Sequence, residues 1–170
     1  MPYVSRVAVD AELYRELLAN FPAGVTVVTA FDAAGTPRGL TLVAFCGVSL
    51  VPPLVLVCVD LESNTLPAIR ASGGYTVNFI GSGSHHIARL MATKSETKFE
   101  GIEWSRSPVP EAGPVLHADT AAHILCRSVQ EIGAGDHVIC LGEVVGGAVN
   151  PDQLPLAYHR REFVKIEART

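Results

Sequence analysis

A continuous apolar stretch over residues 39–60 most constrains how this chain can fold. Two runs of strand-forming residues flank Pro52-Pro53, and the second run ends at Asp60, just before the polar sequence Ser63-Asn64-Thr65. Apolar, β-branched runs of this length favour buried strands, and consecutive prolines end a strand. The stretch therefore predicts two strands joined by a sharp corner, followed by a polar segment that opens a helix.

The rest of the chain is also rich in strands, with helices set apart from them. Asp10 precedes an apolar stripe at helical spacing that ends at Asn20, which predicts a short helix with an Asp N-cap. Further helices are expected over residues 63–72 and from Ser82 or Ser84 through Met91. Strands are expected over residues 25–31, 39–45, 54–60, 75–80, 121–131, 137–149 and 162–166, with turns at 32–36 and 133–136 and a loop at 94–99. Because helices do not alternate with strands, we predict a mainly β fold, an antiparallel barrel with peripheral helices.

Length and composition limit the classes of protein that this chain can belong to. Its 170 residues are expected to form one domain, 1–170. Hydrophobic residues make up 48% and charged residues only 18%, which predicts that apolar surface is buried between the subunits of a homodimer. The net charge of −4 offers no basic surface for nucleic acid, so no nucleic-acid partner is expected.

No segment has the pattern of a membrane span or a signal peptide. The longest apolar run, 54–59, is far shorter than the roughly 20 residues that a spanning helix needs. Residues 1–6 are followed by Asp10 and Glu12 rather than by an apolar core, so we expect a cytoplasmic protein without membrane contact. The four cysteines, which form no CxxC pair, are interpreted as free and mostly buried thiols rather than as disulfides or metal ligands: Cys46, Cys58, Cys126 and Cys140.

Taken by itself, the polar cluster Ser63-Asn64-Thr65 has two interpretations. Hydroxyl and amide groups at a helix start cap the helix, and the same position also favours a phosphate group. No GxGxxG follows a strand, which argues against a Rossmann nucleotide site. The histidines lack metal-ligand spacing, so no metal site is predicted.

Seven segments, in their order and spacing, resemble the short-chain flavin reductase family. They are residues 20–29, 39–60, 63–65, 75–78, 98–104, 135–144 and 155–161, and the likeness covers roughly residues 12–166. The resemblance implies a Greek-key split β-barrel of the FMN-binding type that forms a homodimer. It also implies an NAD(P)H-dependent oxidoreductase that transfers a hydride from NADH or NADPH to FMN or FAD and supplies reduced flavin to a separate flavin-dependent monooxygenase. Neither the preferred nicotinamide nor the preferred flavin follows from the sequence.

The resemblance also implies the roles of individual residues. Ser63, Asn64 and Thr65 would hold the flavin phosphate, with Arg70 or Lys98 as a source of added charge. His137 would be the catalytic residue, placed near the nicotinamide to orient it rather than to act as a strong base. The expected cofactor-binding residues are Thr41, Leu42, Val43, Ala44, Val48, Ser49, Asp60, Ser63, Asn64, Thr65, Lys98, Phe99, Tyr158 and Arg161, the last two at the pyridine-nucleotide groove.

The chain departs from the family pattern along the expected wall of the flavin ring. Relatives commonly read Thr-x-Asn-Ser-Phe-x-Ser-Val-Ser, whereas this chain has Val43 and Ala44 in place of Asn-Ser and Gly47 in place of the middle Ser. Three polar side chains are missing, which predicts weaker flavin binding. Two alternatives therefore stay open: a flavin-binding protein with little reductase activity, and a barrel that serves another ligand.

Overall fold

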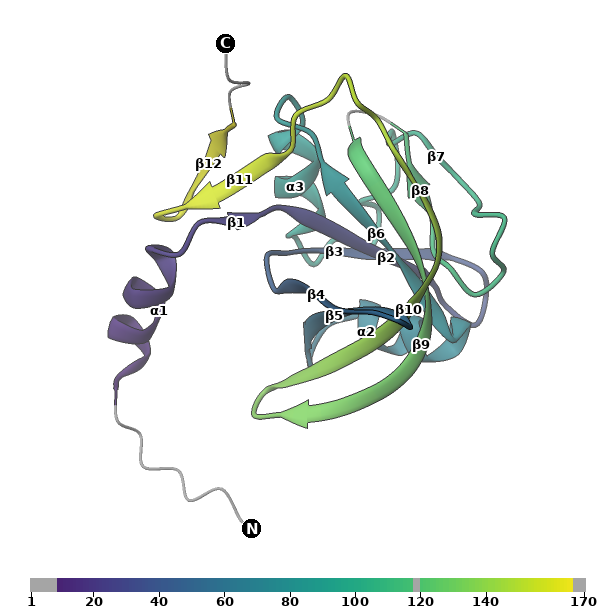
Figure 1. Ribbon diagram of the computed structural model, residues 1–170, viewed down its shortest axis with the longest axis horizontal. Coiled ribbons are helices and arrows are strands. Elements are labelled where there is room, and N and C mark those ends of the chain that lie inside the picture. The colour runs from purple at the N-terminus through teal and green to yellow at the C-terminus, as the bar shows by residue number, and fades with distance from the viewer. Residues whose placement is uncertain (1–8, 118–119, 167–170) are drawn as a thin grey trace.

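Seven strands form one antiparallel sheet in the computed structural model, which describes residues 9–117 and 120–166 (Figure 1). Their order across the sheet is β3-β2-β6-β9-β10-β5-β4. Their bounds are β2 (Thr26–Phe31), β3 (Pro37–Leu42), β4 (Phe45–Leu50), β5 (Pro53–Asp60), β6 (Gly74–Ile80), β9 (Thr120–Ala134) and β10 (His137–Val149). Strands β3 and β4 are consecutive in sequence but stand at opposite ends of this order, so the sheet curves until its edges meet. The predicted mainly β, antiparallel barrel-type fold is confirmed.

The prediction of one strand over residues 39–45 is wrong, because the chain changes partners within it. Thr41 pairs with Val27 of β2, whereas Phe45 pairs with Val57 of β5. The two-residue connection Val43-Ala44 crosses from one edge of the sheet to the other, and the Ala44 carbonyl accepts a hydrogen bond from the Cys58 N–H at 3.1 Å. The apolar pattern continues through this connection, so the pattern alone did not reveal the change.

Buried aliphatic side chains fill the barrel. All six residues of β2 are buried, and β5 alternates between buried and partly exposed positions. Helix α2 (Thr65–Ser72) adds Leu66 and Ile69 to this core, and it ends at Gly73 in the left-handed conformation. A second cluster lies under α3 (His85–Met91), whose Ile87 and Met91 are buried. Each such side chain stabilises the fold by about 1.5–3 kcal/mol of transfer free energy, which anchors both helices against the sheet.

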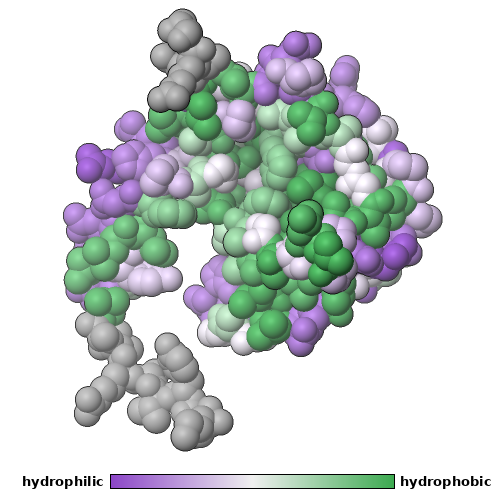
Figure 2. Space-filling model, in the orientation of Figure 1, coloured by the Kyte–Doolittle hydropathy of each residue, from purple (hydrophilic) through white to green (hydrophobic). Residues whose placement is uncertain are grey.

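Helix α1 (Ala11–Ala19) stands away from the barrel. Its predicted cap is confirmed, since the Asp10 carboxylate accepts a hydrogen bond from the Leu13 N–H at 2.8 Å. None of its nine residues is buried, however, and Leu17 is 57% exposed. Figure 2 shows apolar side chains over this helix and a hollow between it and the barrel. The apolar stripe that predicted the helix therefore has no covering surface within the described part of the chain.

The structure contains short strands that the sequence pattern did not predict. Strands β1 (Ala23–Gly24), β11 (Leu156–His159) and β12 (Glu162–Lys165) form a small antiparallel sheet. Strands β7 (Trp104–Ser105) and β8 (Val115–Leu116) form a separate pair. Of these five, only β12 was expected. The other four have two to four residues, which is too few positions for an alternating pattern to be recognised with any regularity.

The irregular segment before β9 is held against the sheet by buried polar side chains. The Thr29 hydroxyl donates to the Pro114 carbonyl at 2.6 Å, and the Thr76 hydroxyl donates to the Gly113 carbonyl at 2.7 Å. The Asn78 side-chain oxygen accepts from the Leu116 N–H at 3.0 Å. Three strand residues of β2 and β6 thus bind a segment that has little regular structure of its own.

The cysteines are free, but they are less uniformly buried than predicted. Cys126 and Cys140 are buried, and burial raises the pKa of the Cys126 thiol to about 12, whereas Cys46 on the edge strand β4 is exposed and Cys58 is half-buried. None of the described helices is both long and apolar enough to cross a membrane. The N-terminal segment 1–6, from which we predicted that the chain has no signal peptide, lies outside the described residues.

Candidate functional site

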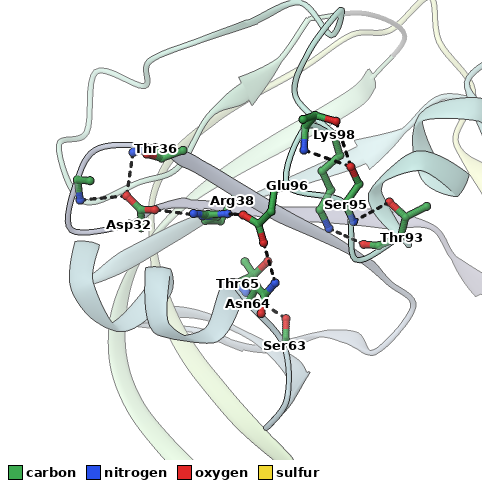
Figure 3. Close-up of polar contacts among 12 residues, drawn as sticks. Asp32, Thr36, Arg38, Ser63, Asn64, Thr65, Thr93, Ser95, Glu96 and Lys98 are labelled. Carbon is green, nitrogen blue, oxygen red and sulfur yellow. Dashed lines mark hydrogen bonds and ion pairs between the residues drawn. The ribbon is translucent and has the colours of Figure 1, made fainter.

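A polar cavity of about 220 Å³ lies at the start of α2. Its wall comes from β3, from the connection between β5 and α2, and from the segment that follows α3. It brings together six of the residues expected to bind the cofactor: Thr41, Asp60, Ser63, Asn64, Thr65 and Lys98. Figure 3 shows the polar contacts on this wall.

The connection 61–64 turns the chain so that its polar groups face the cavity. The Ser63 N–H donates to the Asp60 carbonyl at 3.0 Å, and the Ser63 hydroxyl oxygen accepts from the Thr65 N–H at 3.2 Å. The hydroxyl proton of Ser63 is therefore left to donate to a ligand. Asn64 occupies the N-cap position of α2 but makes no side-chain capping bond. Helix capping therefore does not explain why a polar side chain stands at this position.

A chain of hydrogen-bonded charged and amide groups runs from the turn between β2 and β3 to the same wall (Figure 3). The Asp32 carboxylate accepts from Arg38 Nε at 3.1 Å, Arg38 Nη1 also donates to Glu96, and Glu96 Oε1 accepts from Asn64 Nδ2 at 3.2 Å. The bond to Glu96 is the largest of the effects that raise the pKa of Arg38. Sequence reasoning missed Arg38 and Glu96, since nothing in their spacing links the hairpin at residue 38 to the loop at residue 96.

The two cations that the sequence offered for the phosphate lie in different places. Lys98 lines the cavity, but its ammonium group donates to the carbonyls of Met91 at 3.1 Å and Thr93 at 2.8 Å. Burial lowers the pKa of this lysine. Arg70 is bound to the Glu131 carboxylate at 2.8–3.1 Å and does not line the cavity. Arg38 therefore replaces Arg70 as the guanidinium group of this wall.

Three other predicted residues also have roles in packing. Thr41 lines the cavity, and its hydroxyl donates to the Ala88 carbonyl of α3 at 2.6 Å. Leu42 is buried in the core of the barrel. The Phe99 ring packs on Trp104, with centroids 6.3 Å apart. Contact of Leu42 and Phe99 with a cofactor stays a prediction. Because the Leu42 side chain is buried in the core, its backbone would make most of any such contact.

The expected wall of the flavin ring, residues 43–49, is mostly exposed, and its predicted binding residues Ala44, Val48 and Ser49 line neither the polar cavity nor the apolar cavity that Val43 lines. Val43 and Val48 are 42% and 49% exposed, and Ala44 and Ser49 lie on the same connection and strand. Val43 lines a second cavity, of about 630 Å³, that has no charged residue among its described lining residues. Thr41 belongs to the polar cavity and Val43 to the apolar one, so the strand end places the two environments side by side.

His137 does not line the polar cavity, but it pairs with a residue that does. It begins β10 directly after the turn Gly135-Asp136 and lies opposite the cavity residue Asp60 in the pairing of β10 with β5. Its Nδ1 atom is 2.7 Å from the Asp136 carboxylate, and this bond is the largest cause of the lowered pKa of Asp136. The carboxylate orients the ring, which leaves Nε2 available to a ligand.

Tyr158 and Arg161 lie apart from the polar cavity of the same chain. Tyr158 on β11 packs edge-on against Phe163 at 5.4 Å between centroids. Arg160 and Arg161 form the turn to β12 with φ angles of 50° and 65°, a backbone conformation that non-glycine residues rarely adopt. The Arg160 N–H donates to the Ala19 carbonyl at 2.7 Å, so this turn is tied to the end of α1.

The residues fit a phosphorylated, flat, largely apolar cofactor. The polar cavity offers hydroxyl, amide and guanidinium donors, and the neighbouring wall offers apolar surface without charge. Among residues 9–117 and 120–166, no group of three or more histidine, cysteine or acidic side chains could hold a metal ion.

Comparison with known proteins extends the likeness over most of the chain. Residues 18–167 match the family described as flavin reductase like domain. The sequence is 39% identical over 155 residues to a flavin reductase (NADPH) from Lentzea aerocolonigenes, covering 91% of this chain and 89% of that protein. It is 37% identical over 159 residues to a flavin reductase (NADH) from Kitasatospora aureofaciens, covering 92% and 82%.

Solved structures share the barrel. Nitrilotriacetate monooxygenase component B from Mycobacterium thermoresistibile superposes with a TM-score of 0.87 at 33% identity, over 95% of this chain and 89% of that one. The NADH:FAD oxidoreductase SgcE6 from Streptomyces globisporus C-1027, solved in complex with NAD and FAD fragments, gives 0.86 at 32% identity over 93% of each chain. Since both sequence and fold agree over nearly the whole length, this chain belongs to the flavin reductase like family.

Proposed function

We propose that this protein is an NAD(P)H-dependent flavin reductase, which transfers a hydride from NADH or NADPH to FMN or FAD. The observation that carries the proposal is the pair of adjoining environments at the end of β3. Hydrogen-bond donors that suit a phosphate line one cavity, and an uncharged apolar wall begins two residues further along the chain. The names of the two curated relatives, one using NADH and the other NADPH, support this reaction.

The protein's part in this reaction is to bind and align. A bound flavin supplies the hydride acceptor, and hydride transfer between two flat rings depends on their stacking and distance more than on a strong acid or base. In this proposal, Ser63 and Arg38 hold the phosphate, and the β3–β4 connection supports the ring. His137, oriented by Asp136 and paired with the cavity residue Asp60, positions the nicotinamide.

We further propose that two copies form a homodimer. Helix α1 exposes Leu13, Tyr14, Leu17 and Leu18, each at least 43% exposed, and a second copy would cover this face. In one chain, Tyr158 and Arg161 do not share a cavity with Ser63. A site completed between two copies would account for this separation.

The partner in this proposal is a separate flavin-dependent monooxygenase. The relative from Mycobacterium thermoresistibile is component B of a monooxygenase, and the present chain has the same fold over 95% of its length. Reduced flavin made by this protein would leave it and be used by the oxygenase. A flavin held weakly suits this transfer, because product release then does not limit turnover.

A second candidate function is flavin binding with little reductase activity. It is favoured by one observation, the absence of polar side chains at Val43, Ala44 and Gly47 on the wall that would border the ring. Backbone groups alone would then hold the polar edge of the flavin, which reduces control over its alignment.

One experiment separates the two functions. The purified protein is mixed with FMN and with NADH or NADPH, and the loss of nicotinamide absorbance in air is followed, with flavin omitted as the control. A reductase gives oxidation that depends on both flavin and enzyme. Quenching of flavin fluorescence without nicotinamide oxidation would favour the binding protein. The absence of both signals would reject both functions.

A further inference from the structure

The Glu96 carboxylate occupies two hydrogen-bond donors on the wall of the polar cavity. Its Oε1 atom accepts from Asn64 Nδ2 at 3.2 Å, and its Oε2 atom accepts from Arg38 Nη1 (Figure 3). These are an amide and a guanidinium group, which are among the donors that bind phosphate oxygens in proteins. The Glu96 carboxylate thus binds the same two donors, Arg38 and Asn64, that the phosphate of a ligand would bind.

Two carboxylates hold Arg38, and their settings differ. Asp32 accepts from the N–H groups of Ala34 and Thr36 at 3.0 and 2.9 Å, so it is fixed within its own turn. Glu96 lies in the loop after α3, its side chain is 63% exposed, and among the described residues its carboxylate accepts only from Arg38 and Asn64. Glu96 is therefore the carboxylate that can turn into solvent without breaking a local turn.

Lys98 also lines the cavity, but it does not replace Arg38 and Asn64 as a donor to a phosphate. The Lys98 ammonium group donates to the carbonyls of Met91 and Thr93, which holds the loop in place and reduces its capacity to bind an anion. Arg38 Nη1 and Asn64 Nδ2 are consequently the cationic and amide donors of the wall that a movable side chain, Glu96, occupies.

We propose that Glu96 is a specificity-determining residue that competes with the phosphate of the flavin for Arg38 and Asn64. The proposal rests on the proposed flavin-binding function. When a phosphorylated flavin binds, Glu96 swings out; when reduced flavin leaves, Glu96 returns to the two donors. The residue thus weakens binding of FMN and FAD, leaves riboflavin unaffected because it has no phosphate, and speeds release of the reduced product.

The test compares two flavins on Glu96→Gln and Glu96→Ala variants by titrating flavin fluorescence. Both variants are expected to lower the dissociation constant of FMN about tenfold or more and to slow FMN release in stopped flow, because the phosphate then meets no charged competitor for Arg38 and Asn64. The dissociation constant of riboflavin should change less than about twofold. Glu100→Gln removes the same charge four residues away, outside the cavity lining, and serves as the matched control.

The outcomes separate this inference from the function on which it rests. If the wild-type protein binds neither FMN nor riboflavin, the proposed function fails. If it binds FMN but the Glu96 variants leave the affinity unchanged, weaken it, or shift FMN and riboflavin equally, the competition is rejected and the function stands. An equal gain from Glu100→Gln would also reject it, since general charge would then explain the effect.

Discussion

The hydroxyl of Ser63 is the side-chain donor most directly tied to the proposed phosphate contact. Its oxygen already accepts from the Thr65 N–H, which leaves its proton for a ligand. Thr65, by contrast, is 2% exposed, so changing it would also disturb packing. Ser63 is therefore the cleaner position at which to test the phosphate site.

We predict that Ser63→Ala weakens FMN about tenfold and riboflavin less than about threefold. A hydrogen bond to a charged acceptor is worth about 1.5–3 kcal/mol, and only FMN carries the phosphate. Fluorescence titration with both flavins measures the difference. Equal weakening of the two flavins would mean that Ser63 only shapes the turn before α2.

His137 gives a prediction about turnover rather than affinity. Asp136 holds its ring, and His137 pairs with the cavity residue Asp60, so it lies next to the site where the nicotinamide is proposed to bind. His137→Ala should reduce the rate of flavin reduction by NADH at saturating flavin about tenfold or more, a loss of roughly 1.4 kcal/mol of transition-state stabilisation. Its FMN dissociation constant should stay within about twofold.

Stopped-flow absorbance gives the rate of flavin reduction for this variant, and fluorescence titration gives the affinity. The companion variant Asp136→Asn keeps the imidazole but weakens its orientation, so it should show a smaller loss of rate. Reduced flavin affinity with an unchanged hydride-transfer rate would overturn the assigned role.

Among the elements, β6 connects the sheet to the irregular segment before β9 through Asn78. This buried side chain donates to the carbonyls of Val27 and Pro114, and its oxygen accepts from the Leu116 N–H. Truncation would leave buried backbone groups without partners, which costs about 1–3 kcal/mol for each group left unsatisfied. The element thus stabilises a region that lacks regular hydrogen bonding of its own.

We predict that Asn78→Ala lowers the free energy of unfolding by about 2 kcal/mol or more, which corresponds to roughly 4–8 °C in Tm for a chain of this size. Asn150→Ala is the matched control, because Asn150 is exposed and, among the described residues, its side-chain oxygen accepts only from the nearby Asp152 N–H. Thermal and urea unfolding followed by circular dichroism measure both. A loss for Asn78→Ala no larger than that of the control would show that water replaces its bonds.

For the molecule as a whole, α1 decides how copies assemble in the proposed homodimer. Leu13 and Leu17 lie one turn apart on the same exposed face. We predict that Leu13→Asp combined with Leu17→Asp shifts the dimer to monomer and lowers flavin reduction. The Tm measured at low protein concentration should change little, because α1 contributes no buried residue to the barrel.

Light scattering measures the assembly, and the exposed pair Glu12→Gln with Glu16→Gln on the same helix serves as the control. A wild-type protein that is a stable monomer and still reduces flavin would contradict the proposal. A dimer that survives both aspartates would place the interface elsewhere on the surface.

Much of the fold and part of the candidate site could be predicted because their signals are local. The helix cap at Asp10 and the strand from His137 to Val149 follow from residue types at short spacing, as do the polar residues that precede α2. Predictions failed where partners are distant. The strand expected over residues 39–45 divides at Val43-Ala44 because a different strand takes over the hydrogen bonds, and Arg70 faces Glu131 rather than the cavity.

The amino-acid sequence by itself determines the family, the order of the strands along the chain and the polar segment 63–65, since these depend on residue type and on spacing within a few residues. Folding in three dimensions determines which side chains share the cavity wall. Arg38 and Glu96 are 58 residues apart, and they meet only because the hairpin of β2 and β3 and the loop after α3 pack on the same edge of the barrel. Long-range contacts of this kind arise from the burial of whole elements, and no local pattern encodes them.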